Sequence, residues 1–313
     1  MTATGELSTG VFLRDWHRES LHRWTPSTAR FYGWLVDQTV GHLGDVPLIE
    51  LSADHLRGHF AAAGGRVVGG TDALSASTMA RRHSVLRTAL GDAVRWGLIK
   101  VNPAELIAFD RVSVGRALDS AGVIRLVRAG GPGWFGTLLR LAAVTGARRG
   151  ELCALRRRDI DVERSQVLIA RAMSIGENAT IVEGPTKTRT VRVVSIDPVT
   201  LTRVLGLVDE DQELNPFVFR SRCVEGRPVH PGTVTEFFGR LRRHVAPDGS
   251  LSHVRFGDLR HFAVSGMLEA GVPVSVVSRR IGHATPVTTL RTYNHMLGSP
   301  RPSVADVLAA GVC

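Results

Sequence analysis

The order of helical and β-rich segments along the chain is the feature that most constrains its fold. Residues 8–107 show helical periodicity with short connections, and one of these helices begins at Pro26 directly after the capping residue Thr25. Residues 118–298 contain helical runs around three β-rich runs, and Lys187 lies on or beside a turn between the last two of them. The sequence therefore predicts a mostly α chain with one small β-sheet, an α+β fold, in two domains.

Breaks in periodicity set the domain boundaries. The Asn102-Pro103 pair is expected to stop the last helix of residues 8–107. Residues 108–117 show little periodicity and are predicted to be a linker before a second domain at 118–298. Residues 299–313 are predicted to form a tail with a short apolar-faced helix, which needs a surface to dock against, such as a neighbouring protomer.

The net charge of +10 points to a polyanionic partner, and its distribution says where that partner binds. Residues 1–110 contain 11 basic and 11 acidic residues, which leaves 28 basic and 18 acidic residues for 111–313. The whole excess lies in the C-terminal two-thirds. Charge alone leaves DNA, RNA and simple solubility open.

Other classes of protein are excluded by what the sequence lacks. No run approaches the roughly 20 apolar residues of a membrane span. The first ten residues lack the basic and apolar regions of a secretory signal. Cys153, Cys223 and Cys313 are scattered, without metal-ligand spacing, which indicates a reducing cytoplasm and predicts no metal site.

Three local patterns follow one another in the second half: TGARRGEL at 145–152, GDLRH at 257–261 and IGHATPVTTLRTYNH at 281–295. In this order and spacing they resemble the tyrosine recombinase (phage integrase) family, whose patterns run T-G-x-R-x-x-E-L, then H-x-L-R-H, then L-G-H followed by Tyr ten residues after the His. Residues 8–107 also look like the helical core-binding domain of that family. Each pattern alone is weak, but the ordered set with a lysine-bearing turn between the first two is specific.

The resemblance implies a C-shaped clamp in which a core-binding domain and a catalytic domain close around duplex DNA. It implies site-specific cutting and rejoining of DNA through a 3′-phosphotyrosyl intermediate and a Holliday junction, by four protomers on two sites. It implies no cofactor, and it leaves room for an accessory DNA-bending protein. Because few residues precede the first helix, we expect a compact type without the arm-binding domain of many integrases.

Arg148 and Arg260 match the two arginines of the family. A phosphodiester gains negative charge during attack, and planar guanidinium groups stabilise that charge on its non-bridging oxygens. The alternative for Arg148 is a surface position on an arginine-rich helix. Glu151 would orient an arginine, and an ordinary helical salt bridge is its alternative.

Tyr293 matches the nucleophile of the family. It lies ten residues after His283, and the only other tyrosine, Tyr32, lies in a helical apolar stripe. A tyrosine that forms a phosphoester conserves the bond energy, so no cofactor is required.

The resemblance gives the remaining positions their roles. Lys187 would protonate the departing 5′ oxygen, and a plain phosphate contact is its alternative. His283 would bind the scissile phosphate through a hydrogen bond. His261 and His295 would support packing.

Gly257 breaks the pattern, because the second box of the family begins with a histidine. Three interpretations compete: the family tolerates the change, a nearby histidine (His253 or His261) substitutes, or the protein binds DNA as an architectural or regulatory protein with weakened catalysis. A type IB topoisomerase is a further alternative, distinguished by relaxation of any plasmid by a monomer. Candidate DNA contacts in the first domain are Arg81, Arg82 and Arg87, which lie off the apolar stripe of their helix.

Overall fold

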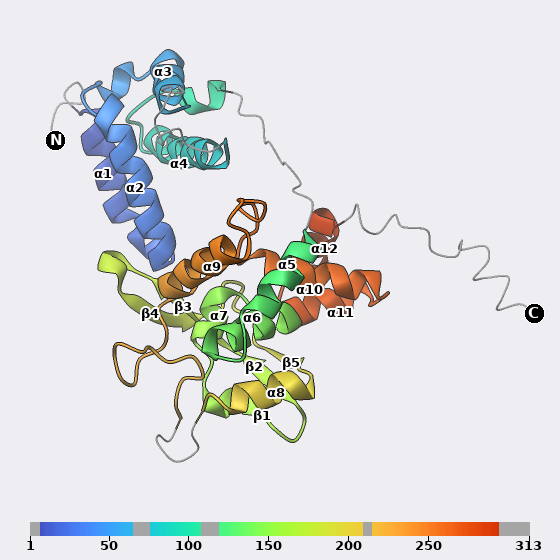
Figure 1. Cartoon of the computed structure of the whole chain (residues 1–313). Coiled ribbons are helices and arrows are strands. Elements are labelled where there is room, and N and C mark those ends of the chain that lie inside the picture. The colour runs from blue at the N-terminus through green and yellow to red at the C-terminus, as the bar shows by residue number, and fades with distance from the viewer. Residues whose placement is uncertain (1–6, 65–75, 108–118, 209–214, 294–313) are drawn as a thin grey trace, which may run out of the picture. The chain divides into compact units, whose positions relative to one another are not determined.

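The computed structural model describes residues 7–64, 76–107, 119–208 and 215–293. The chain divides into two compact units, which we call the first unit (Met1–Arg116 and Gly176–Thr180) and the second unit (Ala117–Ile175 and Ile181–Cys313). The predicted linker at 108–117 and the predicted tail at 299–313 lie outside the described residues. Figure 1 colours the first unit, apart from Gly176–Thr180, blue to blue-green and the second unit green to red.

The first unit is built from helices that enclose one apolar core. Its helices are α1 (Thr9–Glu19), α2 (Pro26–Leu43), α3 (Ala53–Gly64) and α4 (Ala76–Arg95), with a 3-10 turn at Pro103–Leu106. Thr25 is the N-cap of α2 and Pro26 its first residue, as the sequence predicts. Helix α4 ends before the Asn102-Pro103 pair, because Gly97 at φ 72° turns the chain; Asn102 instead caps the 3-10 turn.

A buried acid joins three elements of the first unit. Asp92 on α4 accepts a hydrogen bond of 2.7 Å from the indole Nε1 of Trp16 and forms an ion pair of 3.2 Å with Arg23. It also pairs with Arg95, one turn away on α4. Because both the acid and the indole are buried, these bonds fix α1 against α4.

The structure contradicts the expectation that Arg82 is a DNA contact off the apolar stripe. Its side chain does not lie off the apolar stripe of α4, because the residue is only 1% exposed. Its guanidinium lies 3.2 Å from the imidazole of His59 on α3. Arg81 and Arg87 are exposed. A helix places successive residues about 100° apart, so adjacent arginines cannot all face solvent.

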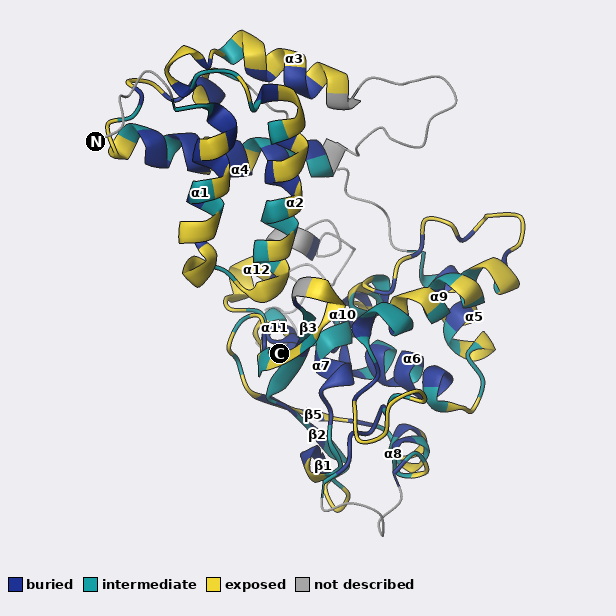
Figure 2. Ribbon diagram, turned by 90° about the vertical axis from the view of Figure 1, so that its left-hand side faces the viewer, coloured by how far each residue is buried: buried dark blue, intermediate teal, exposed yellow. Residues whose placement is uncertain are grey.

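The second unit packs its helices around a larger core. The helices are α5 (Ser120–Ala129), α6 (Trp134–Thr145), α7 (Arg149–Cys153), α8 (Pro198–Leu205), α9 (Pro231–Val245), α10 (Asp258–Glu269), α11 (Val274–Ile281) and α12 (Pro286–Tyr293). Helix α6 is buried along most of its length, and Figure 2 shows it mainly in dark blue. It therefore forms the centre on which the site-bearing elements are placed.

The β-rich runs form two small sheets, where the sequence predicted one. Strands β1 (Ile160–Asp161), β2 (Gln166–Ile169) and β5 (Arg192–Ser195) form an antiparallel sheet in the order β1-β2-β5. Strands β3 (Arg171–Ile175) and β4 (Ile181–Pro185) form a separate antiparallel hairpin. Lys187 lies in the turn between β4 and β5, as predicted. That turn thus connects the two sheets.

The last described helix packs on its two predecessors. Tyr293, at the end of α12, is 5% exposed and belongs to an apolar cluster with Val264 and Leu268 of α10 and Val277 and Ile281 of α11. Burial of this aromatic ring anchors α12 at its C-terminal end. Within the described residues, no helix is both long and apolar enough to cross a membrane.

Candidate active site

The first of the three sequence patterns, at residues 145–152, lies at a sharp turn between helices α6 and α7. Gly146 ends α6 with φ 64°, and a Cβ at this residue would lie 2.3 Å from the side chain of Ile281. Arg148 follows as the N-cap of α7, and its side chain pairs with Glu151 at 2.9 Å. The Arg148 backbone N–H also donates to that carboxylate at 2.8 Å. Glu151 thus contacts both the side chain and the backbone N–H of Arg148, and the Glu151 side chain is buried.

A second arginine on Glu151, Arg192, was missed by the sequence analysis. Its guanidinium donates to both carboxylate oxygens at 2.6 and 3.3 Å, and its side chain is 3% exposed. Burial acts to raise the pKa of Glu151, but the hydrogen bonds from Arg192 and Arg148 outweigh it and hold the pKa below its ordinary value. Strand alternation was the available signal, because Arg192 shares the inward face of β5 with buried Val194.

Arg260, from the second box, lies on α10 with one free donor. Its Nη1 donates to the backbone carbonyl of Gly146 at 2.8 Å, whereas its Nη2 is buried and has no partner among the described residues. Burial, together with the nearby charge of Arg148, lowers the pKa of Arg260 to about 9. A buried guanidinium donor without a partner, beside a second guanidinium, is a site that an anion would stabilise.

Tyr293 contacts the second sequence pattern, residues 257–261, through the side chain of His261. The hydroxyl of Tyr293 lies 2.5 Å from Nδ1 of His261 and donates to it when that nitrogen carries no proton. Burial raises the pKa of Tyr293 to about 12, against the positive charge of Arg260, which acts in the opposite direction. The phenol is therefore neutral at neutral pH and needs a proton acceptor before it can attack.

His283, from the third box, lies among the same charges. Gly282 ends α11 at φ 74°, and the His283 Nδ1 that follows lies 2.7 Å from the hydroxyl of Thr289. Burial lowers the pKa of His283 to about 4, and the charges of Arg260 and Arg148 contribute. The imidazole is therefore neutral at neutral pH.

The remaining predicted residues differ in where the structure places them. Lys187 is exposed in the β4–β5 turn, and the next residue, Thr188, donates to the carbonyl of Gly282 at 3.1 Å, which ties the turn to the loop of His283. Gly257 is exposed at the N-cap of α10. His253 hydrogen-bonds Asp119 at 3.1 Å, away from Tyr293. His295 lies outside the described residues.

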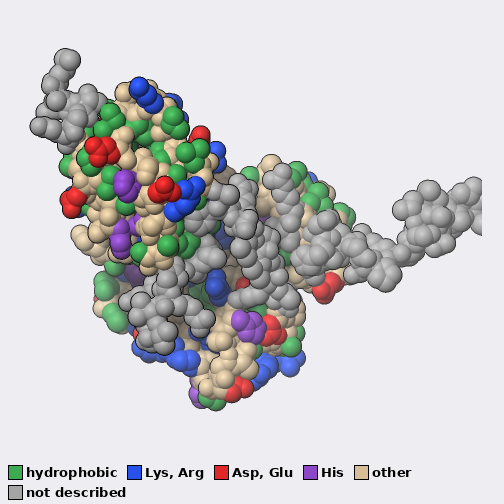
Figure 3. Space-filling view, turned by 90° about the horizontal axis from the view of Figure 1, so that it is seen from above, with side chains coloured by type: hydrophobic (Ala, Val, Ile, Leu, Met, Phe, Trp, Pro, Cys, Tyr) green, Lys and Arg blue, Asp and Glu red, His purple; other side chains and the backbone are tan. Residues whose placement is uncertain are grey.

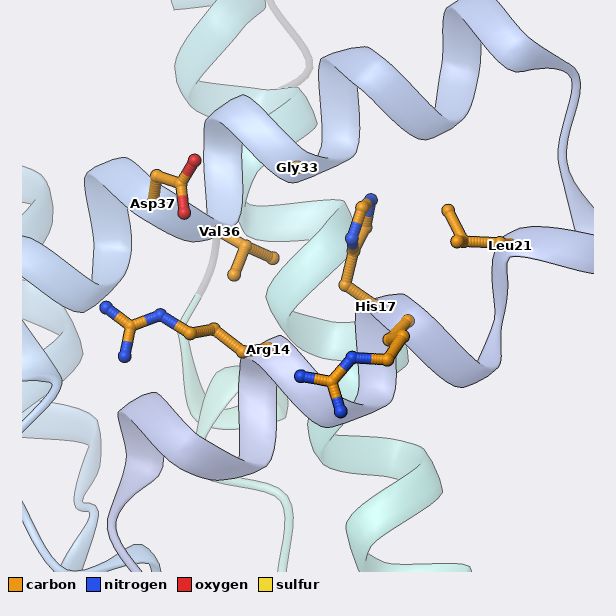
Figure 4. A pocket seen from close by; sticks show the side chains of 7 residues that line it. Arg14, His17, Leu21, Gly33, Val36 and Asp37 are labelled. Atoms are coloured by element: carbon orange, nitrogen blue, oxygen red, sulfur yellow. The ribbon is translucent and has the colours of Figure 1, made fainter. Parts of the chain in front are cut away.

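Other features of the described residues do not compete with this site. They contain no group of three or more His, Cys, Asp or Glu side chains that could hold a metal ion. A pocket of about 260 Å³ lies between α1 and α2 in the first unit, lined by Arg14, His17 and Asp37 among others (Figure 4), and holds none of the site residues. On the face in Figure 3, where grey atoms do not cover it, basic side chains are interspersed with acidic ones.

Comparisons with known proteins agree with the fold and the motifs. The model of the phage integrase family matches residues 132–298. The ICEBs1 integrase of Bacillus subtilis (strain 168) is 25% identical over 183 residues, which are 56% of this chain and 48% of that protein. The tyrosine recombinase XerC of Thermodesulfovibrio yellowstonii is 25% identical over 231 residues, 71% of this chain and 72% of that protein. The chain thus spans about half the length of the first of these relatives.

Solved integrase structures share the fold over nearly the whole chain. The Tn1549 transposon integrase in complex with circular intermediate DNA superposes with a TM-score of 0.73, covering 96% of this chain and 98% of that chain at 16% identity. The lambda integrase tetramer bound to a Holliday junction gives a TM-score of 0.63, covering 91% and 80% at 18% identity. The α+β fold predicted from the sequence is confirmed.

Proposed function

This chain belongs to the phage integrase family, and we propose that it is a site-specific DNA recombinase that cuts and rejoins DNA through Tyr293. One observation carries the proposal: Tyr293 lies beside the buried guanidinium of Arg260, whose Nη2 has no partner among the described residues. A tyrosine hydroxyl next to fixed positive donors suits attack on a phosphodiester, whose charge grows in the transition state.

Each site residue has one role in the proposed reaction. Arg148 and Arg260 bind the non-bridging oxygens of the scissile phosphate, and neutral His283 adds a hydrogen bond. The Oη of Tyr293 attacks phosphorus, the bond from phosphorus to the 5′ oxygen breaks, and Lys187 protonates that oxygen. The products are a 3′-phosphotyrosyl link and a free 5′-hydroxyl, and the hydroxyl of a partner duplex reverses the step.

The proposed partner is double-stranded DNA with specific recombination sites, bound in the cytoplasm by four protomers through a Holliday junction. A lambda integrase tetramer bound to a Holliday junction shares the fold of this chain, which supports that assembly. In the first unit, exposed Arg81 and Arg87 are the candidate DNA contacts, whereas Arg82 is withdrawn because it is buried. Residues 299–313 would dock on a neighbour, and unchanged synapsis after their deletion would refute that role.

The glycine at position 257 supports a second candidate function. A chain without a histidine at this position could bind DNA as an architectural or regulatory protein and form no covalent link. This candidate predicts normal DNA binding by the wild type with no trapped adduct.

Trapping of a covalent adduct on a nicked suicide substrate that contains the junction sequence of the element tests both functions. Wild type, Tyr293→Phe and Gly257→His are compared, and DNA binding is measured for each. We expect an adduct with wild type and none with Tyr293→Phe. An adduct formed only by Gly257→His would support the DNA-binding regulator instead, and no adduct from any variant would refute the recombinase.

A further inference from the structure

The position of Gly257 and the position of His261 lie on the same face of α10. They are four residues apart, which places them one turn apart on a helix. A helical side chain leans toward the N-terminus, so it covers the turn that precedes its own residue. Gly257 has no side chain, and a Cβ at this residue would meet no heavy atom of the described residues within 4 Å. Among those residues, position 257 therefore has room for a side chain.

His261 contacts the reacting atom directly. Its Nδ1 lies 2.5 Å from Oη of Tyr293, and the centres of the two rings are 5.6 Å apart. His253, the other histidine near Gly257 in the sequence, instead holds Asp119 at 3.1 Å. Geometry thus separates two histidines that the sequence alone could not rank.

We propose that His261 is the general base that accepts the proton of Tyr293, in place of the histidine that the second box normally carries at position 257. This inference rests on the proposed function and extends it. The proton of the Tyr293 hydroxyl moves to Nδ1 of His261 while Oη forms its bond to phosphorus. The electron pair of the breaking bond stays on the 5′ oxygen, which takes a proton from Lys187. Imidazolium and neutral amine are the products, and the reverse step restores both.

The charges around the pair act on the transfer in both directions. Arg260, on α10, favours the tyrosinate, whereas Asp258 on the same helix opposes it. The charge of His261 helps to lower the pKa of His283. His283 is neutral at neutral pH, so it does not repel a proton that arrives on His261.

Single-turnover cleavage of a suicide substrate with sulfur in place of the 5′-bridging oxygen tests the assignment. A thiolate leaves without a general acid, so the pH profile reports the base and not Lys187. Wild type, His261→Gln and the matched control His253→Ala are compared. A glutamine can hold the hydroxyl through a hydrogen bond but cannot take up its proton.

We expect His261→Gln to slow cleavage by about 10²–10⁴-fold, the usual contribution of a positioned base, while DNA binding stays as in wild type. The wild-type rate should rise with pH as the base loses its proton, and this rise should vanish in His261→Gln. His253→Ala should keep the wild-type rate. Adding Gly257→His to His261→Gln should restore part of the rate and the rise with pH.

Three results would overturn the assignment. They are an unchanged rate in His261→Gln, a slower rate with the wild-type pH profile, and a double variant as slow as His261→Gln. In each case an adduct that still depends on Tyr293 would leave the proposed function standing. A wild type that forms no adduct on this substrate, with Gly257→His also inactive, would instead refute the proposed function itself.

Discussion

Asp92 in the first unit and Glu151 in the second unit are both buried carboxylates that each bind two arginines. The two pairs of arginines differ in how far they are exposed. The partners of Asp92 turn outward, with side chains of Arg23 and Arg95 that are 48% and 68% exposed. The partners of Glu151 turn inward, with Arg192 at 3% and Arg148 at 26%. The first acid joins helices, whereas the second gathers positive charge inside the protein.

The difference shows how the second unit keeps positive charge buried at the candidate active site. Buried guanidinium groups repel one another and are costly unless a carboxylate compensates them. Glu151 compensates Arg148 and Arg192, whereas Arg260, whose charge acts on Tyr293, keeps an unpartnered donor among the described residues. The second unit therefore carries an unbalanced positive charge where a phosphate would balance it.

Glu151→Gln should have the largest effect on stability, because it leaves Arg148 and Arg192 without their counter-charge. We expect the free energy of unfolding to fall by about 3–5 kcal/mol, the usual cost of breaking a buried ion pair. Urea unfolding measures it, with Glu236→Gln as the matched control, because Glu236 pairs with Arg240 on the surface and its loss should cost about 0.5 kcal/mol or less. Equal losses in the two variants would break the comparison.

Arg260→Ala should separate activity from stability. Cleavage should slow by about 10²–10³-fold, as when one donor to a developing oxyanion is removed. Thermal unfolding should show at most a small loss of stability, because the variant removes the hydrogen bond from Arg260 to the Gly146 carbonyl but also removes a buried donor that lacks a partner among the described residues. A loss of stability with unchanged cleavage would show that Arg260 is a structural residue like Arg23.

The buried His59–Arg82 pair should make the stability of the first unit depend on pH. Burial, helped by the charges of Arg82 and His42, lowers the pKa of His59 from 6.5 to about 4. The unfolded chain therefore takes up a proton first, so stability is full above pH 6.5 and falls as the pH drops toward 4. The loss should approach about 3 kcal/mol. Urea unfolding at several pH values measures it, and the same slope in His59→Gln would refute the assignment to His59.

Trp16→Phe should have the smallest effect of the four. It removes the indole hydrogen bond to Asp92 but leaves an aromatic ring and both arginine partners. We expect a loss of about 1.5 kcal/mol in unfolding free energy, the lower end for a hydrogen bond to a charged group. Trp96→Phe, at an exposed tryptophan, is the control. A loss above that of Glu151→Gln would reverse the order proposed for the two acids.

The sequence alone determined the fold class, the order of helices and strands, and the family. These follow from local signals, such as Pro26 after Thr25, and from motif spacing, such as the ten residues between His283 and Tyr293. Local periodicity also placed Lys187 in a turn, because a turn is a local structure. The same periodicity wrongly placed Arg82 off the apolar stripe, because the pattern did not show which of three nearby arginines faces the core.

Only the tertiary structure decided which side chains meet. The partnership of Arg192 with Glu151 joins residues 41 positions apart, and the choice of His261 over His253 as the partner of Tyr293 spans 32. Neither pairing has a local sequence signal, because each depends on how strand β5 and helix α12 pack against α7 and α10. The sequence supplied the charged groups, and packing in a low-dielectric interior decided which of them are compensated and which remain available to a substrate.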